Sequence, residues 1–283
     1  LDFKYAIAQL GRDTIEKRYG NLFQMYEKIT AVDPYNNPMM IYPAIHYSMG
    51  GLWVDYNLMT TIPGLYAIGE CNFSDHGANR LGASALMQGL ADGYFILPYT
   101  IGDYLAKEIQ TPKVNTNTKE FDEAEKHVTD RLRRLYDIKG TKSPDHFHKE
   151  LGHIMWEYIG MAREAAGLKK AIELIAELKK DFYKNLRVTG EFTAMNNELE
   201  KAARVADFIE LADLMAHDAL DRNESCGGHL RVESMTAEGE AKRDDEHFKY
   251  VSVWEYKGED KAPELHKEEL VFENIQLTQR SYK

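Results

Sequence analysis

The sequence is short of cysteine, of positive charge and of long apolar runs, and each shortage excludes a class of protein. Only Cys71 and Cys226 are present, so neither a disulfide framework nor a cysteine-ligated zinc site is expected. Lys and Arg number 35 against 46 Asp and Glu, a net charge of -11 that argues against a nucleic-acid partner. The most apolar stretch, residues 83–105, is interrupted by polar residues and by Pro98. It therefore lacks the roughly 18 uninterrupted apolar residues of a transmembrane helix.

What is present is mainly helical periodicity. Apolar residues recur at helical spacing from Phe3 to Ile29, with an interruption expected at Gly11 or Gly20. A long helix is predicted from Ser84 to about Ile109, kinked at Pro98 because proline has no N–H to donate. After a linker at residues 111–118, amphipathic stretches of bundle length follow at residues 119–136, 144–165, 167–186 and 195–222.

Extended structure is predicted before and after these helices. Met39–Tyr47, Leu52–Tyr56 and Leu65–Ile68 are apolar and rich in residues that favour strands. Val251–Tyr256 alternates like a strand, and Leu270–Phe272 is also expected to be extended. The expected domains are residues 1–41, 42–110, 111–222 and 223–283.

The residues that could bind a ligand or take part in catalysis lie in three motifs: 46–51 (HYSMGG), 64–70 (GLYAIGE) and 76–86 (HGANRLGASAL). Taken alone, His46 would more often be a core histidine and Arg80 a surface ion-pair partner. The planar guanidinium of Arg80 nevertheless suits a carboxylate bidentately, and Gly50 and Gly51 permit close approach of a ligand near His46. Glu70 follows a predicted buried strand, where open α/β sheets gather ligands.

In this order and spacing, the three motifs resemble the flavoprotein subunit of succinate dehydrogenase and fumarate reductase. The resemblance implies an α+β multidomain fold: the end of a capping domain, the second segment of a Rossmann-like FAD-binding α/β domain, a helical bundle and a small β-containing C-terminal domain. No G-x-G-x-x-G motif follows an early strand and the chain begins at Leu1 rather than Met. We therefore expect these residues to be the C-terminal part of a longer subunit.

The resemblance also implies residue roles. His46 and Arg80 would bind the carboxylates of succinate or fumarate. Glu70 would accept from a hydroxyl of FAD, and Ala83, Ser84 and Leu86 would face the flavin by backbone contact at a helix N-terminus, where the dipole favours anionic reduced flavin. Ala85 stands where many relatives have serine. No catalytic residue is assigned within this chain, because the proton-delivering Arg of the family matches no motif here.

A later segment, Glu224–Arg231 (ESCGGHLR), resembles the Glu-Ser-Arg-Gly-Ala-His segment of the same family, with Cys226 in place of Arg. We interpret it as a hydrogen-bonded hinge between domains. A metal site is not expected, because the histidines between Asp145 and His153 lack the H-E-x-x-H pattern.

The implied activity is succinate:quinone oxidoreductase or quinol:fumarate reductase, with FAD as cofactor and the isolated chain inactive. The implied partners are an iron–sulfur subunit and, indirectly, a membrane-anchor cytochrome b subunit, which would make the subunit cytoplasmic and peripheral on the cytoplasmic membrane. Two alternatives stay open. One is an L-aspartate oxidase, disfavoured by Met49 where that family typically has Cys, and the other is a non-catalytic module that docks a partner.

Overall fold

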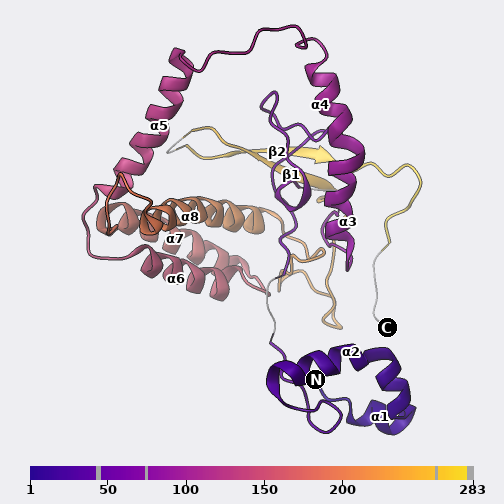
Figure 1. Cartoon of the computed structure of the whole chain (residues 1–283). Coiled ribbons are helices and arrows are strands. Elements are labelled where there is room, and N and C mark those ends of the chain that lie inside the picture. The colour runs from indigo at the N-terminus through magenta and orange to yellow at the C-terminus, as the bar shows by residue number, and fades with distance from the viewer. Residues whose placement is uncertain (43–45, 74–75, 259–260, 279–283) are drawn as a thin grey trace. The chain divides into compact units, whose positions relative to one another are not determined.

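The computed structural model describes residues 1–42, 46–73, 76–258 and 261–278. The chain divides into two compact units, Leu1–Ser48 and Met49–Lys283. Figure 1 shows helices through most of the chain and one small antiparallel sheet near its end. This agrees with the expected α+β multidomain class.

The first unit contains two helices, α1 (Lys4–Leu10) and α2 (Arg12–Thr30). They are separated at Gly11, which has a φ of 81° that favours glycine, so the interruption predicted there is confirmed. Gly20 lies inside α2 and does not break it. The core of this unit consists of Ile15, Phe23 and Met39.

The prediction of strands between residues 39 and 68 is wrong for the residues that the structure describes in this range. Residues 43–45, which the prediction also covered, lie outside the described residues. Only isolated bridges form, Leu52 with Asn72 and Met59 with Tyr66. An extended segment becomes a strand only when neighbours accept its backbone hydrogen bonds along its length. Composition predicted the apolar character correctly, since Val54, Leu58 and Ala67 form a small core.

The long helix predicted over residues 84–109 is divided into three parts: α3 (Ser84–Ala91), the π-helical turn η2 (Asp92–Ile96) and α4 (Leu97–Leu105). The irregularity therefore precedes Pro98 instead of occurring at it. Pro98 lies in the first turn of α4, where its missing N–H costs little. Residues 106–109 are not helical.

The helical domain follows the predicted order closely. Its elements are α5 (Lys119–Tyr136), α6 (Pro144–Ile154) with the π-helical turn η3 (Met155–Ile159), α7 (Ala165–Asn185) and α8 (Asn197–Asp221). Helices α6, α7 and α8 lie side by side (Figure 1). They enclose the largest core of the molecule, whose most deeply buried members include Phe147, Leu168, Ala171, Ile175, Phe182, Ala202 and Ile209.

Both halves of the Asn196 side-chain amide make hydrogen bonds at the N-terminus of α8. Its Oδ1 accepts from the N–H groups of Glu198 and Leu199 at 3.0 and 3.1 Å. Its Nδ2 donates to the carbonyl groups of Thr189 and Glu191 at 2.9 and 3.2 Å. Asn196 thus fixes the loop before α8 as well as the start of the helix.

We expect Asn196→Ala to lower the free energy of unfolding by about 1 kcal/mol, because the helix loses its cap. Asn196→Asp is the matched variant, since a carboxylate still accepts from the two N–H groups. Urea unfolding of both variants measures the difference. Equal losses for the two would show that the cap is not the source of the stability.

The C-terminal segment carries a hairpin of β1 (Tyr250–Glu255) and β2 (Glu264–Glu269), paired from Tyr250 with Glu269 to Glu255 with Glu264. The first strand confirms the prediction for residues 251–256. The second strand is not the predicted Leu270–Phe272 but the preceding charged segment. Because β2 is mostly exposed, it is held by backbone hydrogen bonds to β1 and does not require apolar side chains. In the described part of the chain, no helix is long and apolar enough to cross a bilayer.

Candidate flavin and dicarboxylate site

Glu70 lies on a single helical turn, η1 (Gly69–Cys71), which begins two residues after the buried Ala67. Its side chain is exposed. The turn is held from one side by the backbone of Leu52, whose N–H donates to the Cys71 carbonyl at 2.8 Å and whose carbonyl accepts from Phe73 at 2.9 Å. The carboxylate is therefore presented to solvent from a backbone segment that is itself fixed.

Gly51 explains how Leu52 approaches this turn so closely. A Cβ added at Gly51 would lie 2.5 Å from the Cys71 carbonyl oxygen and 2.6 Å from that of Asn72. Both atoms belong to the backbone, so no larger residue fits without moving the turn. The sequence suggested that this glycine permits approach of a ligand. In the structure, it permits approach of the chain to itself.

A polar cluster of the buried Asn72 and Asp92 and the half-buried Gln88 joins the Glu70 turn to α3. One carboxylate oxygen of Asp92 accepts from the Gln88 side chain at 2.7 Å and from the Gly69 N–H at 3.4 Å. Asn72, 2% exposed, donates to the Ala67 carbonyl at 3.1 Å. The Glu70 turn and α3 are in close contact beside this cluster: a Cβ added at Gly89 would lie 3.5 Å from the Gly69 Cα.

The sequence analysis missed this cluster. Gln88 and Asp92 appeared there only as polar interruptions of an apolar stretch. Their spacing of four residues places them on one face of a helix, and that spacing is the signal by which they are recognisable. A carboxylate that is 6% exposed needs hydrogen-bond donors, and here the donors are Gln88 and the backbone of the Glu70 turn.

The N-terminus of α3 contains the other predicted cofactor residues. Ala83, at the N-cap, has a left-handed φ of 63°, and no side chain caps the helix. Ser84 donates its hydroxyl to the Leu81 carbonyl at 2.7 Å, so this hydroxyl is engaged within the chain. Leu86 is 80% exposed. The first N–H groups of a helix have no intrahelical acceptors and are backbone donors for an anionic or carbonyl-rich ligand.

These features fit FAD as a ligand. An exposed carboxylate that accepts from hydroxyl groups and an uncapped helix start that donates N–H groups belong to two elements in contact with each other. A flavin nucleotide has both kinds of group, hydroxyls on its ribityl and ribose parts and carbonyl oxygens on its ring. Glu70 lies on η1, and Ala83, Ser84 and Leu86 lie at the start of the neighbouring α3; their contacts with FAD stay predictions.

Arg80 and His46 belong to different units of the chain. Arg80 is half-buried in the loop before α3, where its Nη1 donates to the Leu81 carbonyl at 3.2 Å. His46 is exposed and belongs to the unit Leu1–Ser48. Their roles in substrate binding stay predictions.

The Glu224–Arg231 segment has the hydrogen bonds expected of a hinge at the end of α8. Arg231, 2% exposed, donates through Nη1 to the carbonyl groups of Ala219, Leu220 and Arg222 at 3.0 to 3.3 Å. These carbonyls belong to the C-terminus of α8, whose last carbonyls lack intrahelical donors. Arg231 thereby links the C-terminal segment to the helical domain.

His229 completes this link in its neutral form. Its Nδ1 lies 2.7 Å from Nη1 of Arg163, which can only donate, so Nδ1 accepts. Its Nε2 must then carry the proton and donate to the Arg222 carbonyl at 2.8 Å. Burial is the largest cause that holds the pKa of His229 below its ordinary value, and the charges of Arg163 and Arg231 act in the same direction.

This lowered pKa predicts a loss of stability in acid. Below about pH 6.5, the ordinary pKa of histidine, the unfolded chain binds a proton that folded His229 does not. The stability that neutral His229 contributes to the fold is therefore fully present above that pH. It is lost as the pH falls through the lower pKa of His229 in the folded state. His229→Gln should reduce the pH dependence between about pH 6.5 and 5, because glutamine can accept and donate in the same places without titrating.

Urea unfolding at several pH values, followed by circular dichroism, measures this effect. His127→Gln is the control, since His127 is exposed on α5 and should keep the pH dependence of the parent. If His229→Gln loses stability with acid as steeply as the parent, His229 is not the group that titrates.

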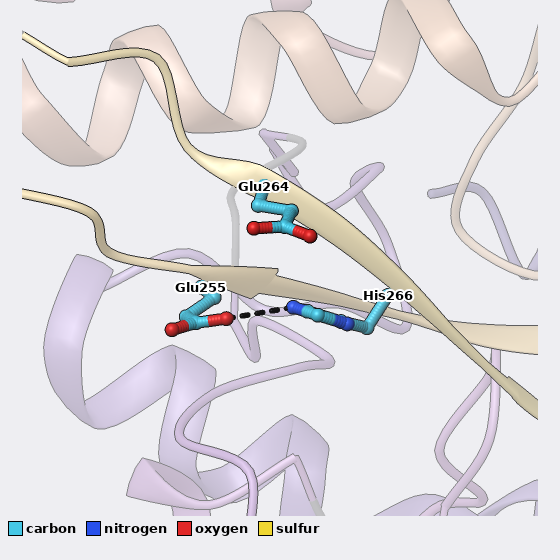
Figure 2. Close-up of side chains that lie close together, drawn as sticks. All are labelled: Glu255, Glu264 and His266. Atoms are coloured by element: carbon cyan, nitrogen blue, oxygen red, sulfur yellow. Dashed lines mark hydrogen bonds and ion pairs between the residues drawn. The ribbon is translucent and has the colours of Figure 1, made fainter.

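A group of side chains that resembles a metal site lies elsewhere, on the β1–β2 hairpin. Figure 2 shows Glu255, Glu264 and His266 close together, with His266 Nε2 2.8 Å from a carboxylate oxygen of Glu255. All three are exposed, and Nζ of Lys257 lies 3.1 Å from both carboxylates. The ammonium group thus already compensates the charge that a cation would balance.

Comparison with known proteins identifies the family. Residues 148–282 match the profile described as fumarate reductase flavoprotein C-term, and residues 5–86 match that of the FAD binding domain. The succinate dehydrogenase flavoprotein subunit of Bacillus subtilis is 31% identical over 95% of this chain and 44% of its own length. The fumarate reductase flavoprotein subunit of Haemophilus influenzae is 33% identical over 80% of this chain and 37% of its own length.

A solved structure, quinol fumarate reductase of Escherichia coli, matches with a TM-score of 0.81 and 28% identity over 99% of this chain and 45% of its own. The chain thus spans less than half the length of these relatives. The FAD binding match covers the Glu70 turn and the start of α3. The chain therefore belongs to the family of flavoprotein subunits of succinate dehydrogenase and fumarate reductase, whose cofactor is FAD.

Proposed function

We propose that the protein containing this chain interconverts succinate and fumarate with FAD. The observation that carries the proposal is the continuity of residues 76–86. This segment holds Arg80, a carboxylate-binding side chain, and leads directly into the uncapped start of α3, which packs against the Glu70 turn. A dicarboxylate anchor and the flavin-facing backbone are thus only a few residues apart along one continuous segment.

The proposed roles of this chain's residues are those that the family resemblance implies and that their chemistry permits. Arg80 and His46 bind the substrate carboxylates and orient the reacting carbon atoms. Glu70 accepts from a hydroxyl of the cofactor, while Ala83, Ser84 and Leu86 contact the ring through their backbone. FAD, when bound, supplies the group that accepts or returns hydride. Alignment of reactants by such contacts accounts for a large share of the rate of an enzyme.

An exposed apolar surface on α3, η2 and α4 supports a larger assembly. Leu86, Met87, Tyr94, Phe95 and Tyr99 are each between 67% and 80% exposed. Large apolar side chains that are this exposed on neighbouring helical segments are expected to contact other protein. We propose that further parts of the FAD domain cover it in the complete subunit.

We also propose partner subunits. The structural relatives include a quinol-fumarate reductase with menaquinol molecules and the Sdh1 complex of Mycobacterium smegmatis. By analogy, an iron–sulfur subunit would carry electrons to or from the flavin, and a cytochrome b subunit would anchor the assembly. The subunit would then lie peripherally on the cytoplasmic face of the membrane.

Purification of the full-length subunit tests the proposed function. It should show a flavin spectrum, reduce fumarate with reduced viologen and oxidise succinate with an artificial acceptor. L-Aspartate with oxygen serves as the rival substrate pair. A flavin-containing protein that oxidises aspartate but is inactive toward both dicarboxylates would contradict the proposal, and one that binds no flavin would indicate a docking module.

A further inference from the structure

Residues Cys226–His229 form a tight turn that the roles above do not use. The N–H of Cys226 donates to the His229 carbonyl at 2.9 Å, and the N–H of His229 donates to the Cys226 carbonyl at 3.0 Å. Gly227 and Gly228 form the tip. Gly227 has a φ of 60°, a conformation in which a side chain is strained.

The base of this turn is held by hydrogen bonds on both sides. His229 contacts Arg163 and the Arg222 carbonyl as described above. The buried Ser225 donates its hydroxyl to the Arg231 carbonyl at 3.0 Å and accepts from the Arg231 N–H at 2.8 Å. Displacement of the tip is therefore resisted by hydrogen bonds to the end of α8 and to the segment after it.

The tip touches the loop that carries Arg80 and the side chain of Met49. The N–H of Gly228 donates to the Ala78 carbonyl at 3.0 Å, and a Cβ added at Gly227 would lie 1.9 Å from that same oxygen. A Cβ added at Gly228 would lie 2.8 Å from Cε of Met49. Ala78 precedes Arg80 by two residues and Met49 follows His46 by three.

We propose that the Cys226–His229 turn is a positioning element for dicarboxylate binding. It contacts no substrate itself. It holds the carbonyl of Ala78 and thereby sets the direction in which the loop presents Arg80. The inference rests on the proposed function, since it takes Arg80 as the carboxylate anchor. A two-pronged guanidinium contact depends strongly on orientation, so a small displacement of the loop weakens it.

Three glycine variants of the full-length subunit in its complex test the proposal. Gly227→Ala introduces a clash with backbone that only movement of the Ala78 loop relieves. Gly228→Ala meets only the flexible end of Met49. Gly239→Ala is the control for backbone strain, because Gly239 has a φ of 80° but no atom within 4 Å of an added Cβ.

We expect Gly227→Ala to raise the KM for fumarate and the Kd for malonate, a dicarboxylate that binds without turnover, by about tenfold or more. FAD content and the flavin midpoint potential should equal those of the parent. Gly228→Ala should show a smaller rise and Gly239→Ala none. A merely structural role would lower the melting temperature of Gly227→Ala and leave its malonate Kd unchanged, which would overturn the proposal.

A measurement on the unmodified complex keeps the proposal testable even if Gly227→Ala does not fold. Coupling is reciprocal, so a turn that improves dicarboxylate binding must itself be stabilised by a bound dicarboxylate. Saturating malonate should therefore slow amide hydrogen exchange in a peptide covering Gly227–Leu230 and leave the turn at Thr236–Gly239 unaffected. Unchanged exchange at Gly227–Leu230, with malonate shown to be bound, would overturn the inference alone. A parent complex that neither binds malonate nor turns over dicarboxylates would overturn the proposed function as well.

Discussion

Arg80→Lys in the full-length subunit should lower kcat/KM for both fumarate and succinate by about 30- to 1000-fold, which is about 2 to 4 kcal/mol of lost transition-state stabilisation. Lysine keeps the positive charge but supplies a single ammonium group in place of two parallel N–H donors. FAD should stay bound, because Glu70 and α3 are unchanged. The loss would then be one of substrate geometry alone.

Steady-state kinetics and the flavin-to-protein ratio of the purified variant measure this effect. Arg204→Lys is the matched control, since Arg204 lies exposed on α8 and pairs there with Glu200. It should retain the activity of the parent. Unchanged kcat/KM in Arg80→Lys would remove Arg80 from the substrate site.

His46→Ser should also lower kcat/KM, by about 2 to 4 kcal/mol if His46 donates to a carboxylate whose charge rises in the transition state. Serine keeps a hydroxyl donor, but its shorter side chain does not reach the same position. The substitution acts in the unit Leu1–Ser48, whereas the residues assigned to FAD belong to the other unit. Flavin content should therefore be unaffected.

The same two measurements distinguish a substrate role from a structural one. His127→Ser, on the exposed face of α5, controls for the loss of a histidine. If His46→Ser loses flavin while the flavin-containing fraction keeps the specific activity of the parent, His46 maintains the fold and does not bind substrate.

The helical part of the fold was predictable because its signals are local. Amphipathic periodicity predicted α5 over the residues it occupies and located α7 and α8 to within about two residues at each end. Gly11 was a recognisable break for the same reason. Strands were harder to predict, because apolar extended segments such as Leu65–Ile68 form a sheet only where neighbouring strands complete their hydrogen bonds.

The sequence predicted candidate site residues but not the groups that hold them in place. Glu70, Arg80 and the helix start at Ser84 stand in motifs whose residue types indicate their ligands. Asp92 was not recognisable as the residue that joins the Glu70 turn to α3, because its role depends on a backbone N–H brought to it by folding. The contact of Gly228 with Ala78 depends likewise on residues far apart in the chain.

The sequence by itself thus determined the family and the helical domain, and it predicted the residues of a flavin and dicarboxylate site, because these depend on periodicity and on motifs within short windows. Only the tertiary structure decided which backbone groups support those residues. It showed that Gly51 serves the packing of the chain on the Glu70 turn, and that Gly227 and Gly228 reach the loop of Arg80. A glycine has no side chain to indicate its partner, so its role becomes visible only when the opposing backbone is in place.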